Sequence, residues 1–136
     1  MTEFRKVTDQ LSVAPQIALD DLAKAAAQGF RLVVNNRPDG EEPGQPTSAE
    51  VEVAATAAGL AYVHIPVRGS PTPEQVEAEQ QLFETEKGPV LAFCRSGTRS
   101  IITWSLGQVL AGDLSRSELV ALGESAGYDL SNVLPR

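Results

Sequence analysis

Three short apolar segments, separated by helix-forming stretches, constrain the fold of this chain more than any other feature. They are residues 30–35 (Phe-Arg-Leu-Val-Val-Asn), 61–65 (Ala-Tyr-Val-His-Ile) and 89–93 (Pro-Val-Leu-Ala-Phe). Each has the length of a buried strand and is bounded by glycine, proline or a polar loop. Strands that alternate with helices pair in parallel, with helices on both faces of the sheet. The sequence therefore predicts a single-domain, three-layer α/β/α fold over residues 1–136 with a mostly parallel sheet.

Capping signals mark the predicted helices between these strands. Thr47 and Glu50 have the spacing of a capping box, in which each residue satisfies a free backbone N–H at the start of a helix. Asp20 and Ser115 are expected to cap two other helices, and Pro73 occupies the first position of a third. The predicted helices cover residues 20–27, 47–58, 73–86, 99–110 and 115–124, and residues 4–7 and 11–13 are expected to be short strands.

The charge and hydropathy of the chain exclude two classes of partner. The net charge is -7 and the basic residues form no run, whereas nucleic-acid binding requires clustered lysine and arginine. No apolar stretch approaches the ~20 residues that a membrane helix needs, and residues 1–10 lack the pattern of a signal peptide. We therefore expect a cytoplasmic protein that binds neither nucleic acid nor a membrane.

The chain contains one cysteine and one histidine. A single cysteine cannot form an internal disulfide, which fits a reducing compartment. One cysteine and one histidine are also too few for a metal site. We therefore expect no metal and no organic cofactor.

The segment Cys94-Arg95-Ser96-Gly97-Thr98-Arg99-Ser100 carries the chemistry. An apolar strand ends at Cys94, and a helix is predicted to begin near Arg99. Such a loop can turn its backbone N–H groups towards an anion, and the helix N-terminus adds partial positive charge. These features favour a thiolate, so Cys94 and Arg99 are the predicted catalytic residues rather than parts of the core. The predicted anion-binding residues are Arg95, Ser96, Gly97, Thr98, Ser100, Arg37 and Arg68.

Other polar residues lie at the predicted strand ends, which share one edge of a parallel sheet and should converge with Cys94. Arg37 either grips an anionic substrate or pairs with nearby acidic residues, and the sequence leaves both open. Asp39 precedes a glycine and is first a turn signal, but it is also a candidate acid–base residue. His64 is expected to be structural and Trp104 to anchor the core or an interface. A solvated helix face is predicted from Glu74, Glu77, Glu79 and Glu84.

Four motifs, in the same order, resemble one bacterial family. They are Pro15-Gln16, residues 35–42 with Gln45-Pro46, residues 64–67, and residues 88–92 with 94–100. Over roughly residues 10–112 the chain resembles the phosphatase-like domain of the beta-lactamase hydrolase-like proteins, a group also described as a sulfur transferase family. The loop at Cys94 is similar to the active loop of rhodanese-type sulfurtransferases and cysteine-dependent phosphatases. The resemblance implies a cysteine-phosphatase-like fold and a link to sulfide or persulfide handling.

Loop length and the general acid bear on the choice of reaction. Four residues separate Cys94 from Arg99, whereas the resemblance to cysteine phosphatases implies five. Residues 67–72 contain no Asp or Glu where those enzymes carry a general acid, although Asp39 or Glu41 could substitute. We therefore favour sulfur transfer through a Cys94 persulfide. The alternative is a cysteine-dependent phosphatase with a Cys94 phosphoenzyme, and a second alternative is a non-catalytic persulfide carrier or thiol sensor.

The favoured reaction predicts its partners by chemical class. They would be a small anionic sulfur donor and a thiol acceptor. The resemblance adds a third, because domains of this family occur alone or fused to a persulfide-dioxygenase-like metallo-hydrolase. A separate enzyme of that kind is therefore an expected partner.

Overall fold

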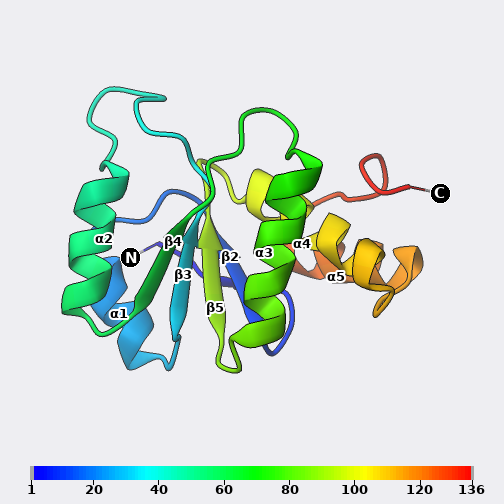
Figure 1. The fold of residues 1–136 in the computed structure, drawn as a ribbon, viewed down its shortest axis with the longest axis horizontal. Coiled ribbons are helices and arrows are strands. Elements are labelled where there is room, and N and C mark those ends of the chain that lie inside the picture. Colours follow the sequence, from blue (N-terminus) through cyan, green and yellow to red (C-terminus); the bar gives the residue numbers. More distant parts are fainter. Residues whose placement is uncertain (1, 136) are drawn as a thin grey trace.

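The computed structural model describes residues 2–135, which form a five-stranded sheet flanked by helices (Figure 1). The strand order is β1-β2-β5-β3-β4; β1 is antiparallel to β2 and all other pairs are parallel. This arrangement confirms the predicted mixed α/β fold with a mostly parallel sheet. The strands are β1 (Arg5–Lys6), β2 (Leu11–Ala14), β3 (Leu32–Asn35), β4 (Ala61–His64) and β5 (Val90–Phe93). The helices are α1 (Asp21–Ala27), α2 (Ser48–Ala57), α3 (Pro73–Thr85), α4 (Thr98–Ala111) and α5 (Arg116–Ala126).

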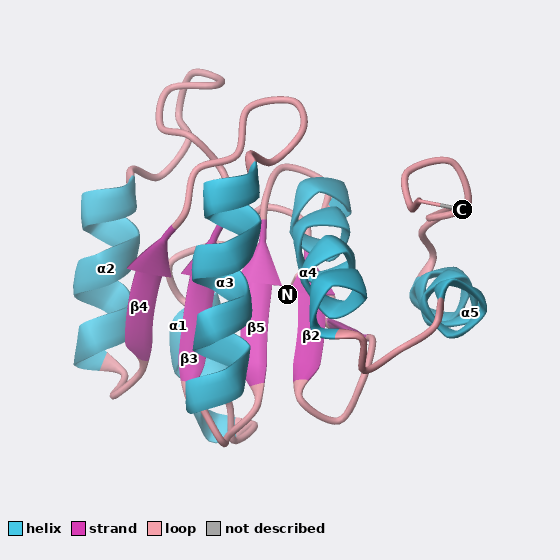
Figure 2. Cartoon of the chain, turned by 45° about the vertical axis from the view of Figure 1, so that its right-hand side comes forward, coloured by secondary structure: helices cyan, strands magenta, loops and turns pink. Residues whose placement is uncertain are grey.

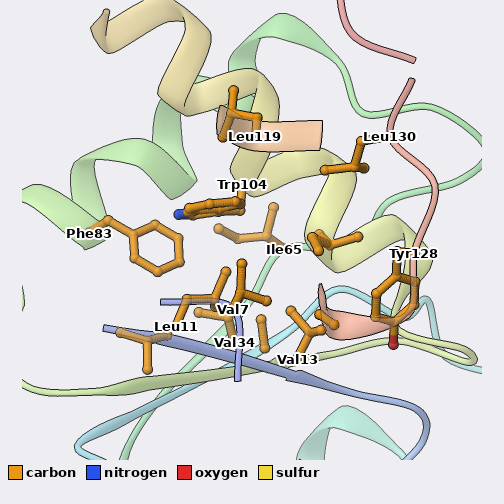
Figure 3. Close-up of a cluster of buried hydrophobic side chains, with 14 of the residues drawn as sticks. Val7, Leu11, Val13, Val34, Ile65, Phe83, Trp104, Leu119, Tyr128 and Leu130 are labelled. Atoms are coloured by element: carbon orange, nitrogen blue, oxygen red, sulfur yellow. The ribbon is translucent and has the colours of Figure 1, made fainter. Parts of the chain in front are cut away.

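Helices cover both faces of the sheet. Helices α1 and α2 lie on one side and α3 and α4 on the other, with α5 beyond α4 (Figures 1 and 2). Because successive side chains of a strand point to opposite faces, Val33 packs in the cluster with α1 and α2, whereas Val34 packs in the cluster with α3 and α4. Figure 3 shows the second cluster, in which Trp104 is buried as the sequence predicted for a core anchor.

The carboxyl ends of the neighbouring strands β5, β3 and β4 converge next to Cys94. Asn35 is in register with both His64 and Phe93. Beyond the strands, the Asn36 N–H donates to the Phe93 carbonyl at 2.8 Å, and the Ile65 N–H donates to the Asn35 carbonyl at 2.9 Å. The convergence predicted from the strand ends is confirmed, and backbone hydrogen bonds fix the floor of the site.

Most of the predicted helix starts are confirmed, but one cap is not. The Thr47 and Ser115 side chains each take part in a capping box. The prediction for Asp20 was wrong, because its side chain makes no capping hydrogen bond. Its φ of -73° and ψ of -14° are helical, whereas a capping side chain needs extended backbone to reach back to the first turn. The neighbouring Asp21 carboxylate instead accepts from the Ala18 N–H at 2.9 Å.

Two properties of the described residues concern membranes and metal ions. Within residues 2–135, no helix combines the length and apolar character that crossing a membrane requires. The same part of the chain holds no group of three or more His, Cys, Asp or Glu side chains placed to share a metal ion.

Candidate active site

Cys94 follows β5 directly and is fully buried at the start of a short loop that leads into α4. Gly97 closes this loop with a φ of +93°, a conformation that L residues with a Cβ rarely adopt. This turn directs the Gly97 N–H towards the sulfur, and the distance from its nitrogen to Cys94 Sγ is 3.1 Å. The loop therefore presents a backbone donor to the thiol, as an anion-stabilising loop does.

Arg99 lies in the first turn of α4 with its guanidinium engaged by an acidic residue. Its Nη1 donates to Glu41 Oε2 at 2.7 Å and its Nη2 to Glu41 Oε1 at 2.8 Å, which is a bidentate pair. Nη1 also donates to the Val67 carbonyl at 2.8 Å. The bonds to Glu41, and then the nearby Cys94, raise the pKa of Arg99 above its usual value. Arg99 therefore keeps its positive charge beside Cys94, and Glu41 occupies the forked face of its guanidinium.

Arg37 turns away from solvent and binds the acidic loop that follows it. The side chain is completely buried. Nε donates to Glu41 Oε1 at 2.9 Å, Nη2 to Glu42 Oε1 at 3.2 Å, and Nη1 to Gln16 Oε1 at 3.1 Å. Of the two roles that the sequence left open, these contacts match pairing within the loop. Arg37 as a substrate-binding residue stays a prediction.

Glu41 is the acidic residue that both arginines share. Its hydrogen bonds to Arg99, and then to Arg37, lower its pKa to about 2, against burial that acts in the opposite direction. Such a carboxyl is ionised throughout the neutral range and has no proton to give. It serves as an internal counter-ion of the site.

Three other predicted residues lie at the surface. Asp39 is exposed, and its Oδ1 accepts from the Ser48 N–H at 2.7 Å at the start of α2. Arg68 and Arg95 are also exposed, and no ion pair is found for either within residues 2–135. The structure therefore brings Arg99 near Cys94, whereas Arg68 and Arg95 are exposed cations.

The hydroxyl groups of the loop divide into two kinds. Ser96 Oγ donates to Thr98 Oγ1 at 2.9 Å and accepts from the Thr98 N–H at 3.3 Å, so this pair braces the loop. Ser100 is fully buried, and its Oγ has no hydrogen-bond partner within residues 2–135. Ser100 as an anion-binding residue stays a prediction.

The expectation that Glu79 belongs to a solvated helix face was wrong. Glu79 is 1% exposed, and its Oε1 accepts from Asn36 Nδ2 at 2.7 Å. Burial raises the pKa of this carboxyl to about 7, although the Asn36 bond acts against the rise. The sequence does hold a signal: Val76, Glu79 and Phe83 have the i, i+3, i+7 spacing of one helix face, and all three are buried.

His64 has a structural contact, as predicted, with Nε2 at 2.8 Å from the Arg37 carbonyl oxygen. Tyr128, by contrast, was missed, because the sequence after α5 carries no clear pattern. Its hydroxyl donates to the Ser96 carbonyl at 2.9 Å, which brings the segment after α5 to the Cys94 loop. Only the tertiary structure reveals this contact.

A family model describes the same region. The phosphatase-like domain of the beta-lactamase hydrolase-like protein matches residues 3–111. The chain belongs to this family. A beta-lactamase hydrolase-like protein from Agrobacterium fabrum is 40% identical over 126 residues, which cover 92% of this chain and 29% of the relative. One from Xylella fastidiosa is 39% identical over 129 residues, covering 94% and 30%. The chain thus spans less than a third of these relatives, and the family resemblance inferred from the motifs is confirmed.

Solved structures extend this family assignment to the fold. A protein from Neisseria meningitidis with a provisional phosphatase name superposes with a TM-score of 0.83 at 31% identity, covering 95% of this chain and 92% of that one. Tk-PTP in its active form gives a TM-score of 0.75 at 20% identity, covering 94% and 87%. The fold of this family member is therefore cysteine-phosphatase-like, as predicted. These matches agree better with the phosphatase alternative than with sulfur transfer.

Proposed function

We propose that this domain transfers sulfane sulfur through a persulfide on Cys94. The observation that carries the proposal is the bidentate ion pair between Arg99 and Glu41. A phosphate group would need the forked face of Arg99, which Glu41 already occupies. An alkoxide leaving group would need a proton, and a carboxyl with a pKa of about 2 cannot supply one. Transfer of a single sulfur atom requires neither the forked face of Arg99 nor a proton for the leaving group.

The reaction then follows from the groups around the thiol. The Cys94 thiolate attacks the outer sulfur of a donor such as thiosulfate, forming a Cys94 S–S bond and releasing sulfite with the electron pair of the broken bond. The Gly97 N–H, 3.1 Å from Sγ, and the Arg99 cation stabilise the negative sulfur. A thiolate acceptor then attacks the outer sulfur, leaves with it, and returns Cys94 as thiolate. The exposed cations Arg68 and Arg95 would attract the anionic donor.

A cysteine-dependent phosphatase is the second candidate, and the family and fold favour it. Among the matching folds is a kinase associated phosphatase with its catalytic cysteine replaced by serine, at a TM-score of 0.75 and 12% identity. For phosphate transfer in this chain, Glu41 would have to leave Arg99 as the substrate bound. Asp39 would then have to leave the Ser48 N–H to act as the acid. The phosphatase proposal therefore requires a rearranged loop between β3 and α2.

The partners follow from the proposed reaction. The donor would be a small sulfane-sulfur anion and the acceptor a thiol. The curated relatives are more than three times as long as the matched region, so this domain is only part of each of them. A persulfide-dioxygenase-like enzyme that consumes the product persulfide is the proposed protein partner.

Paired assays on one preparation test the proposal. Thiosulfate with cyanide and glutathione persulfide with a thiol report sulfur transfer, while an aryl phosphate reports phosphatase turnover. Sulfur transfer that Cys94→Ser abolishes, without phosphate release, is the expected result. Phosphate release alone would overturn sulfur transfer in favour of the phosphatase. A Cys94 persulfide that forms but never turns over would make the domain a carrier.

A further inference from the structure

The peptide unit between Ser96 and Gly97 is held at both ends. Its carbonyl oxygen accepts from the Tyr128 hydroxyl at 2.9 Å, and its N–H donates to Cys94 Sγ at 3.1 Å. The bond is trans, so the oxygen and the N–H point in opposite directions across one plane. A bond that fixes the oxygen therefore also fixes the direction of the N–H.

The loop does not fix this orientation by itself. Gly97 has no Cβ and accepts positive and negative φ almost equally, so rotation of the peptide is cheap at this residue. A rotated peptide would turn its carbonyl oxygen towards the sulfur and repel a thiolate. A contact outside the loop is needed to exclude that orientation.

Tyr128 is built into the fold in a way that supplies this contact. Tyr128 is 9% exposed, and its ring lies at the edge of the cluster in Figure 3 with its oxygen pointing out of the cluster. Arg5 of β1 lies over the ring, 5.3 Å from its centre. The Tyr128 N–H donates to the Gly123 carbonyl at 2.8 Å, which ties the residue to the end of α5. Burial raises the pKa of Tyr128, so the hydroxyl keeps the proton that it donates.

We propose that Tyr128 is a positioning residue for Cys94, which orients the Ser96–Gly97 peptide so that its N–H faces the sulfur. The proposal rests on Cys94 being the nucleophile of the proposed function, and it applies to either reaction. A hydrogen bond to the carbonyl oxygen also polarises the peptide and strengthens its N–H as a donor. Tyr128 lies beyond the residues 3–111 that the family model matches, so family membership alone does not predict this role.

The test is the rate of Cys94 alkylation by iodoacetamide in Tyr128→Phe, measured between about pH 5 and 9. Cys94 is the only cysteine, so the modification is unambiguous. Tyr128→Phe keeps the ring and its contact with Arg5 and removes only the hydroxyl. We expect the rate at neutral pH to fall about three- to tenfold, the equivalent of one neutral hydrogen bond. The amide proton resonance of Gly97 should shift upfield, as expected for a weaker hydrogen bond to the sulfur.

Tyr62→Phe is the matched control. Its hydroxyl bonds Ser48 Oγ at 2.7 Å and Asn35 Nδ2 at 3.0 Å, beside the other core cluster. This variant should lose comparable stability but keep the wild-type alkylation rate. Equal rates in wild type and a folded Tyr128→Phe would overturn the positioning role, as would an equal fall in Tyr62→Phe. Because Cys94 is buried, the pH profile of the rate tests the nucleophile itself: a wild-type rate that rises only in the pH range of an ordinary free thiol would count against it.

Discussion

Glu79→Gln should remove a pH dependence of stability that the buried carboxyl imposes. Asn36 Nδ2 donates to Glu79 Oε1, while Asn36 Oδ1 and Glu79 Oε2 are both buried without a partner. Neither atom has a partner within residues 2–135, and both are acceptors when the carboxyl is ionised. A proton on Oε2 turns one of them into a donor, so the folded protein favours neutral Glu79. Glutamine has the same shape, and its amide can donate in place of that proton.

The magnitude follows from the two protonation equilibria. Burial raises the pKa of Glu79 from 4.5 to about 7. Between these values the unfolded chain has released the proton and the folded chain still holds it, so stability falls as pH rises. At about 1.4 kcal/mol for each pH unit, the wild type loses about 3 kcal/mol between pH 4.5 and 7 through this group. Well above pH 7, Glu79 is ionised in both states, and stability no longer changes with pH through this group.

Few charged groups surround Glu79, so the cause of its raised pKa can be identified. Among the described elements packed around Glu79, the only charged side chain of α4 is Arg99, which pairs with Glu41. His64 is the only basic side chain of the strands β3, β4 and β5. Burial is therefore the cause of the raised pKa of Glu79, and the Asn36 hydrogen bond acts against it. Subtracting the free energy of unfolding of the wild type from that of the variant at each pH removes the contribution of every other titrating group.

Urea unfolding followed by Trp104 fluorescence at several pH values measures the effect. The stability of Glu79→Gln relative to wild type should rise by about 3 kcal/mol between pH 4.5 and 8. Glu77→Gln, at an exposed position of the same helix, should follow the wild type. Parallel curves for Glu79→Gln and wild type would refute the reasoning, because Glu79 would then titrate alike in both states.

Three further predictions concern the site. Arg99→Ala should slow alkylation of Cys94 severalfold at neutral pH, because the cation beside the sulfur is lost; an unchanged rate would contradict this. Gly97→Ala should cost more in urea unfolding than Gly40→Ala, since both have positive φ but only the Gly97 position would press a Cβ against Tyr128; equal losses would contradict it. Glu41→Gln should tighten binding of sulfate to the site in calorimetry by weakening the counter-ion of Arg99; unchanged affinity would show that Glu41 does not compete with anions.

Local patterns predicted the parts of the structure that depend on neighbouring residues. The capping box at Thr47 and the start of α5 at Ser115 rest on side chains that reach three residues along the chain. The Cys94 loop was located in the same way, because its strand, glycine and helix are adjacent in sequence. Convergence of the strand ends followed from parallel pairing alone. The capping prediction for Asp20 was wrong because its backbone is already helical, which the residue type alone does not reveal.

The parts that sequence did not predict depend on contacts between distant segments. Glu79 meets Asn36 across 43 positions of the chain, and Tyr128 meets Ser96 across 32. Glu41 meets Arg99 across 58 positions. The sequence around each of these residues does not identify its distant partner. A polar residue in a pattern of buried positions, such as Glu79 between Val76 and Phe83, is a sequence signal that could have revealed the burial of Glu79.

A continuous set of hydrogen bonds connects the buried carboxyl to the candidate site. Glu79 binds the Asn36 side chain, the Asn36 carbonyl accepts from the Val67 N–H at 2.9 Å, and the Val67 carbonyl accepts from Arg99 Nη1. Glu79→Gln preserves the geometry of the first bond, so Arg99 keeps its place and the alkylation rate of Cys94 should stay at the wild-type value. Replacing Glu79 with leucine leaves one N–H of the Asn36 amide without its partner, while the other still donates to the Ile65 carbonyl at 3.1 Å. The cost of that buried donor, about 1–3 kcal/mol, falls on the segment that holds Arg99. A slower alkylation in Glu79→Leu than in Glu79→Gln would thus trace the support of Arg99 to this carboxyl, and equal rates would show that the backbone bonds to Asn36 suffice.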